Sequence, residues 1–214
     1  MNALGFDSLG RDLNVIFVES VFRSLMFGIA VSIVITVLLI AFLFIWFRFS
    51  FTKNLTRAVI ISDHIVPKLL ILIILSTFST DYKFLILMLG IIIVLLPSIY
   101  SQLMIQLNFK IHPALKDYYL TRSNYSVLFF YEILPLVSPL LILNFFSAII
   151  HSILLETVLT HLGIGMEFGT PSIGFLLSDG LNNFYQNKTE LFLALSMIII
   201  LAFSGAFISN KISK

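Results

Sequence analysis

The most polar of the apolar stretches, residues 133–162, carries several side chains that could do chemistry. It holds Asn144, Ser147, His151, Ser152, Glu156, Thr157, Thr160 and His161. Histidine and glutamate are metal ligands, but His151, Glu156 and His161 follow one another at intervals of five residues. Five residues rotate an α-helix by about 140° beyond a full turn. The three side chains therefore cannot share one helix face, and a three-ligand metal site on this helix alone is excluded.

Glu156 is an acidic residue within a predicted membrane span, so its surroundings have to compensate for its charge. A charged group in the hydrocarbon region costs at least ~2.5 to 3.5 kcal/mol, so Glu156 should face a bundle interior or an aqueous path. Ser152 and Thr160 lie four residues before and after it, at the spacing of neighbours on a helix surface. Two interpretations follow: a polar or metal-conducting pathway, or hydrogen-bonded packing between helices.

The sequence offers no catalytic constellation, and no enzyme activity or cofactor is expected on this chain. It has no cysteine, which excludes disulfides, thiolate metal sites and thiol catalysis. It also lacks a phosphate-binding glycine loop followed by Lys and Ser or Thr, and it has neither a zinc-protease HExxH motif nor a nucleophile elbow. No metal ligand set is predicted.

The composition is that of an integral membrane protein. Of 214 residues, 59% are hydrophobic and 11% are charged, whereas soluble domains carry roughly 25% charged residues. The net charge of +2 is too small to suggest binding to nucleic acid. Apolar runs that can cross a lipid bilayer predict one all-α domain, residues 1–214, with five transmembrane helices. These are 24–47, 61–78, 84–107, 133–162 and 190–208, with longer polar segments at 108–132 and 163–189.

The distribution of basic residues predicts the orientation of these helices. The connector 48–57, the loop 110–122 and the tail 211–214 hold eight Lys and Arg residues, against four in the segments on the other side. Basic loops face the cytoplasm. The N-terminus is therefore expected outside, the C-terminus and segment 108–132 in the cytoplasm, and segment 163–189 outside.

Two motifs resemble signatures of one transporter family. LGFDSLGRD, residues 4–12, resembles the LGTDxxGRD segment in permease subunits of dipeptide, oligopeptide and nickel ABC importers. ILLETVLTHLGIGMEFGTPSIGFLLSDG, residues 153–180, resembles their ILLExxLSFLGLGxxxPxPSWGxxLxxG segment. The principal matching positions are Gly5, Asp7, Gly10, Arg11 and Asp12 in the first motif, and Glu156, Gly163, Gly165, Pro171, Ser172, Gly174 and Gly180 in the second.

This resemblance implies a type I ABC importer permease fold in the plasma membrane, without the family's usual first helix. It implies a second permease subunit, with which the chain forms a pathway for import of peptides or of a metal or metal chelate. It also implies two ATP-binding subunits or domains, which carry ATP and Mg, and an extracytoplasmic solute-binding protein. The residues expected nearest the pathway are Asn144, Ser147, Ser152, Glu156 and Thr160.

The same family carries an EAA motif, a short helix-turn-helix that docks on the ATPase, in the cytoplasmic loop that closes with ILP, here residues 133–135. The core of that motif is only faintly visible in DYYLTRSNYS, and Asn124 is expected to replace the turn glycine. The residues expected to couple to the ATPase are Asp117, Tyr118, Tyr119, Leu120, Thr121, Arg122, Asn124, Leu134 and Pro135. An amphipathic helix lying on the membrane interface is the alternative for this loop.

The role of the first motif and the activity of the chain each allow more than one interpretation. LGFDSLGRD is expected to be a structural turn in which Asp and Gly satisfy the backbone, although Asp7 and Asp12 could instead bind a metal or substrate. The missing first helix and the eroded EAA core favour a degenerate permease that acts as a structural or regulatory partner. Export of a small peptide by the same scaffold is also compatible with the sequence.

Overall fold

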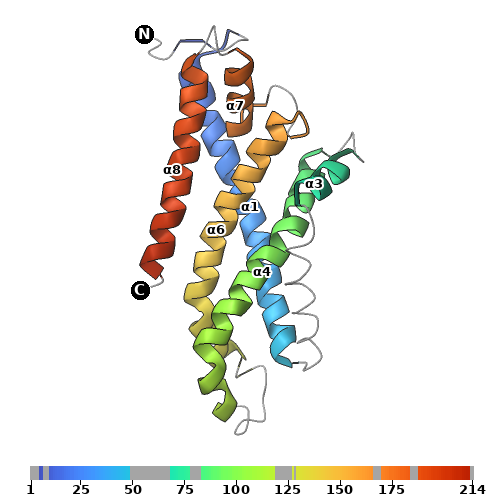
Figure 1. Cartoon of the computed structure of the whole chain (residues 1–214), viewed down its shortest axis with the longest axis vertical. Helices are drawn as coiled ribbons and strands as arrows, with labels where there is room; N and C mark the ends of the chain where they lie inside the picture. The colour runs from blue at the N-terminus through green and yellow to red at the C-terminus, as the bar shows by residue number, and fades with distance from the viewer. Residues whose placement is uncertain are drawn as a thin grey trace.

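The regular elements of the protein are helical (Figure 1). The computed structural model describes residues 5–6, 10–48, 68–77, 83–118, 127, 129–165, 170–183 and 188–212. Within these ranges the elements in chain order are α1 (Leu13–Arg48), α3 (Lys68–Thr77), α4 (Lys83–Tyr118), the short π-helix η1 (Phe129–Ile133), α6 (Leu134–His161), α7 (Ile173–Asn182) and α8 (Lys188–Ile212). The prediction of an all-α fold is confirmed.

Among the described residues, four helices are long and apolar enough to cross a membrane: Leu13–Ile45, Phe84–Ile105, Leu134–His161 and Lys188–Gly205. The protein is therefore a multi-pass membrane protein. The fifth predicted span, 61–78, is not among them. Its described part is α3, whose 10 residues extend about 15 Å, half of the ~30 Å hydrocarbon core; residues 61–67 and 78 lie outside the described ranges.

Helix α6 is the central element and packs against α1, α4, α7 and α8. α1 and α4 run in one direction along the bundle and α6 runs in the other (Figure 1). The main core gathers buried residues four or seven apart in sequence, which lie on one face of each helix. They include Val31, Ile35 and Leu39 of α1, Ile91, Leu95 and Ile99 of α4, and Val137, Leu141 and Ala148 of α6.

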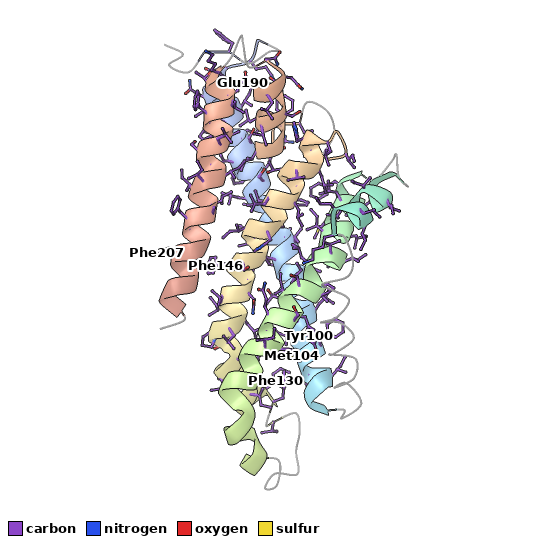
Figure 2. The ribbon with its side chains drawn as sticks, viewed as in Figure 1. Tyr100, Met104, Phe130, Phe146, Glu190 and Phe207 are labelled. Atoms are coloured by element: carbon purple, nitrogen blue, oxygen red, sulfur yellow. The ribbon has the colours of Figure 1, made fainter. Side chains whose placement is uncertain are left out.

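The outward faces of the same helices are also apolar, as expected of a chain whose solvent is lipid. On α8, Phe192, Phe203 and Phe207 are 65%, 72% and 70% exposed. Figure 2 shows Phe207 on the side of α8 away from the bundle, whereas Tyr100 and Met104 of α4 lie within it. The inside and the outside of this bundle therefore differ little in polarity.

Two helices extend about ten residues beyond a predicted boundary, and one helix was not predicted. α1 begins at Leu13, not at residue 24, because Glu19 and Arg23 form an ion pair of 2.8 Å on its exposed face and do not interrupt it. α4 continues to Tyr118 and so includes residues 108–118 of the segment expected to be a cytoplasmic loop. α7 occupies part of segment 163–189, which was predicted only as a polar segment between spans.

The entrance to α6 contains two prolines, and the structure compensates for them locally. Pro139 has no N–H to donate to the carbonyl of Pro135. The hydroxyl of Ser138 donates to that carbonyl oxygen at 2.8 Å, which satisfies it as Ser and Thr side chains do at prolines in membrane helices. Pro135 itself stands in the first turn of α6, where a proline is tolerated.

Candidate functional site

A buried carboxyl group lies where α6 meets α1 and α7. The side chain of Glu156 has no exposed surface. Its Oε1 accepts a hydrogen bond of 2.9 Å from the hydroxyl of Thr160 on the next turn of α6. The hydroxyls of Ser24, on α1, and Ser172, immediately before α7, also interact with this carboxyl group. We call these four residues the Glu156 cluster.

The two serines of the cluster hold the first turn of α7 in place. The backbone N–H of Ile173 donates to Ser24 Oγ at 3.1 Å, and that of Phe175 donates to Ser172 Oγ at 3.1 Å. Ser172 is thus the N-cap of α7, a position that serine favours because its side chain satisfies a free helical N–H. Each hydroxyl accepts from the backbone and keeps its own proton, and both hydroxyls interact with the Glu156 carboxyl group.

The placement of α7 also suits a negative group at Glu156. The N-terminus of a helix carries a partial positive charge from its free N–H groups, and α7 begins one residue after Ser172, which contacts the carboxyl. The second carboxyl oxygen, Oε2, is buried and has no hydrogen-bond partner of its own within the described ranges. The side chain of Glu156 therefore connects α1, α6 and α7, and its Oε2 can accept a further hydrogen bond.

The glycines of the second motif allow this junction to form. Gly163 ends α6 with φ +76°, a conformation that residues with a Cβ rarely adopt. Its N–H donates to the carbonyl of Thr160 at 3.0 Å, and that of Ile164 donates to Leu159 at 2.9 Å. This pair of bonds is the Schellman motif, which turns the chain back at a helix end.

Two further glycines permit close approach to α6. A Cβ added at Gly174, on α7, would lie 2.9 Å from Cα of Thr157. A Cβ added at Gly165 would overlap Thr160, the hydroxyl partner of Glu156. Any larger residue at either position would push α7 or its approach away from α6. Pro171, which precedes the N-cap, is buried at the same junction.

The first motif forms a turn that enters α1 at the same end of the bundle. Gly5 and Gly10 have φ of 91° and 76°, and the N–H of Leu13 donates to the carbonyl of Gly5 at 3.1 Å. Asp12 caps α1, since its Oδ1 accepts from the N–H of Asn14 at 2.9 Å. This geometry agrees with the structural interpretation of LGFDSLGRD for Asp12, while Asp7 lies outside the described residues.

The two motifs touch each other. The guanidinium carbon of Arg11 lies 5.5 Å from the ring centroid of Phe175, the third residue of α7, within the range of a cation–π interaction. Ser24 provides the second connection, from α1 to the first N–H of α7. Segments that are far apart in the sequence therefore form one packed unit at one end of the molecule, where Figure 1 shows α7 beside the first turns of α1 and α8.

The residues predicted to line a pathway separate into two groups. Asn144, Ser152 and Glu156 are buried against the chain's own helices. Asn144 Nδ2 donates to the carbonyl of Leu140 at 2.9 Å and Ser152 Oγ to that of Ile149 at 2.8 Å, so both amide and hydroxyl bond the backbone of α6. Thr160 belongs to the Glu156 cluster. Ser147 lies on a different face of α6, half-buried beside the exposed His151.

Sequence reasoning missed two members of the cluster as partners of Glu156. Ser24 is an inconspicuous serine in an apolar run, and its role depends on a contact 149 residues away. Ser172 gave a usable signal: a serine before an apolar segment is a typical N-cap. In the parts of the chain that the structure describes, no group of three or more His, Cys, Asp or Glu residues could hold a metal ion.

Most of the predicted coupling residues cannot be placed. Asp117 and Tyr118 end α4, and Leu134 and Pro135 begin α6. Tyr119, Leu120, Thr121, Arg122 and Asn124 lie outside the described residues.

Comparison with known proteins gives no assignment: no protein-family model matches this chain, and no curated protein matches it. The fold alone defines the class, an all-α, multi-pass membrane protein.

Proposed function

We propose that this chain is a permease subunit of an ATP-binding cassette importer. With a second permease it forms the pathway for import of peptides or of a metal or metal chelate across the plasma membrane. Two ATP-binding subunits or domains drive it, and ATP and Mg act there and not on this chain. An extracytoplasmic solute-binding protein delivers the substrate.

The observation that carries this proposal is the convergence of the two motifs around Glu156. Positions that match the family pattern have connected roles: Glu156 accepts from Thr160, Gly163 turns the chain, and Gly174 lets α7 approach α6. Arg11 of the first motif lies over Phe175, which follows Gly174. Two motifs that are far apart in the sequence therefore lie against each other at one end of the bundle.

The direction of the helices supports five crossings. α1 and α4 run in the same direction along the bundle (Figure 1). Two spans of the same direction require a crossing of the opposite direction between them, and we assign that crossing to the span predicted at 61–78. With five crossings and the basic segments inside, the Glu156 cluster and α7 face outward, and the chain between α4 and α6 faces the ATP-binding subunits.

The proposal is tested by purifying the tagged chain from its native membrane and identifying the proteins that accompany it by mass spectrometry. A second permease, ATP-binding subunits and a solute-binding protein are expected. Two substitutions in the predicted coupling loop, Tyr119→Glu and Arg122→Glu, should reduce recovery of the ATP-binding subunits and retain the second permease. A matched control is Arg23→Glu, since Arg23 lies near the other end of the bundle and pairs with Glu19 on an exposed face. Recovery without any ATP-binding subunit would refute the proposal.

A further inference from the structure

An exposed histidine lies halfway along a membrane-spanning helix. His151 is in α6, which runs over 28 residues from Leu134 to His161. It stands ten residues before the end of α6, which places it about 15 Å from that end, near the middle of a hydrocarbon core of ~30 Å. In the isolated chain its side chain is exposed. A polar ring at this depth needs a polar neighbour or water.

The hydrogen bonds of His151 fix which ring nitrogen is unsatisfied. Nδ1 lies 2.7 Å from the carbonyl oxygen of Ser147. A carbonyl can only accept, so Nδ1 carries the proton, and in the neutral ring Nε2 is left as an acceptor. The hydroxyl of Ser147 lies 3.3 Å from the same Nδ1. Within the part of the chain that the structure describes, Nε2 of this exposed ring therefore remains an acceptor without a hydrogen-bond partner.

The surroundings of this pair on α6 are apolar. Ser147, His151, Leu154 and Val158 follow at intervals of four, three and four residues, which place them on one helix face. Val158 is 41% exposed and Leu154 is half-buried. If lipid covered this face, Nε2 would stand unsatisfied in hydrocarbon, which costs several kcal/mol. Ionisable residues within membrane spans instead face protein interiors or water-filled cavities.

We infer that the face of α6 with Ser147 and His151 borders the water-filled translocation pathway. This inference rests on the proposed transport function and specifies where the solute passes. Nε2 accepts hydrogen bonds from water and from N–H groups of a polar solute. Ser152 and Glu156 lie on another face of α6, and together with the buried Asn144 they hold the chain's own helices together. Water supplies the missing donor at Nε2 without requiring a partner side chain at one fixed position.

The absence of cysteine from the sequence makes a direct test available. Single variants His151→Cys and Ser147→Cys are made in the assembled complex and treated in membranes with a charged, membrane-impermeant methanethiosulfonate reagent. Phe203→Cys is the lipid-side control, because Phe203 is 72% exposed and lies near the depth of His151. The depth of Phe203 follows from its neighbour Gly205, which packs against Ile150, the residue before His151. A Cβ added at Gly205 would lie 2.7 Å from Ile150. Ala148→Cys is the buried control, since Ala148 is 0% exposed.

Modification of both pathway variants at least about tenfold faster than either control is the expected result, because the reactive thiolate forms in water and not in an apolar environment. Ser147→Cys retains the histidine and covers the case in which His151→Cys fails to assemble. Modification of His151→Cys no faster than that of Phe203→Cys would overturn the inference. So would protection of His151→Cys together with cross-linking to another subunit, which would identify a packed interface. Failure of the proposed function itself is recognised separately, by purification without ATP-binding subunits.

Discussion

Replacing Glu156 by alanine should destabilise the fold more than any other single change in a polar side chain of this bundle. The substitution removes the acceptor of the 2.9 Å bond from Thr160 and the group with which Ser24 and Ser172 interact. A buried donor left without an acceptor costs about 1–3 kcal/mol. The methylene groups and carboxyl of a fully buried residue also leave a cavity, which adds a cost that grows with its volume.

Together the unpaired donor and the cavity give an expected loss of about 3–5 kcal/mol in the free energy of unfolding. Glu156→Gln keeps the shape and one acceptor oxygen, so we expect it to lose less than half as much. The assay is reversible unfolding of the purified chain in mixed micelles with increasing sodium dodecyl sulfate, followed by far-ultraviolet circular dichroism.

Glu19→Ala is the matched control. Glu19 pairs with Arg23 at 2.8 Å, but the two side chains are 43% and 46% exposed, and such exposed pairs contribute about 0–1 kcal/mol. A loss for Glu156→Ala no larger than that for Glu19→Ala would refute the argument that the cluster holds the three segments together. A loss for Glu156→Gln equal to that for Glu156→Ala would show that hydrogen bonding at Oε1 is not the source of the stability.

Three further predictions concern the junction and are checked by the same unfolding assay. Gly163→Ala should cost about 1 kcal/mol, because its φ of +76° is unfavourable for a residue with a Cβ; Gly163→Asn, which tolerates that conformation, should cost less. Gly174→Ala should cost more than Gly163→Ala and should also increase protease cleavage around α7, because its Cβ would lie 2.9 Å from Thr157 Cα; unchanged cleavage would show that α7 does not need this approach. Asp12→Ala should cost about 1 kcal/mol by removing the cap of α1, while Asp12→Asn should be nearly neutral, and equal losses would contradict the capping role.

The spans that could be predicted from sequence are those whose apolar runs have clear ends. The predicted span 133–162 agrees with α6 within one residue at each end, because Pro135 marks its start and Gly163 its end. The predicted start of α1 is wrong because Glu19 and Arg23 look like a polar boundary. Four residues apart on one helix face, they neutralise each other, and composition alone does not distinguish such a pair from two isolated charges.

The extension of α4 and the existence of α7 were missed for a different reason. Residues 108–118 contain Asn, Lys, Asp and Pro113, which suggest a loop, but polar residues are compatible with a helix that leaves the membrane and continues in water. In 163–189 the SDG sequence resembles a turn. The first turn of α7 is favoured by the cap from Ser172 and by the contact with Ser24, and the second of these is a tertiary effect.

The candidate site shows the same limit of sequence reasoning. Glu156 could be identified because an acid in a membrane span has to be compensated. Its partner Thr160 could be identified from the spacing of four residues. Ser24 and Ser172 could not be deduced as partners, because Ser24 lies on another helix and neutral serines are common in apolar runs. Nor could the sequence decide which polar residues of α6 face inward. Asn144 and His151 both stand in the same span. Asn144 donates a hydrogen bond to the carbonyl of Leu140 inside the bundle, whereas His151 is exposed.

The Glu156 cluster limits how this end of the protein can move. α7 is bonded to α1 through Ser24, it approaches α6 too closely at Gly174 to slide along it, and its cap interacts with Glu156. A displacement of α7 alone would break all three contacts at once. If transport opens and closes the outer end, α7 should therefore move as one body with the adjoining turns of α1 and α6. A solute-binding protein that docks on α7 would then act directly on α6, the helix whose open face we assign to the pathway.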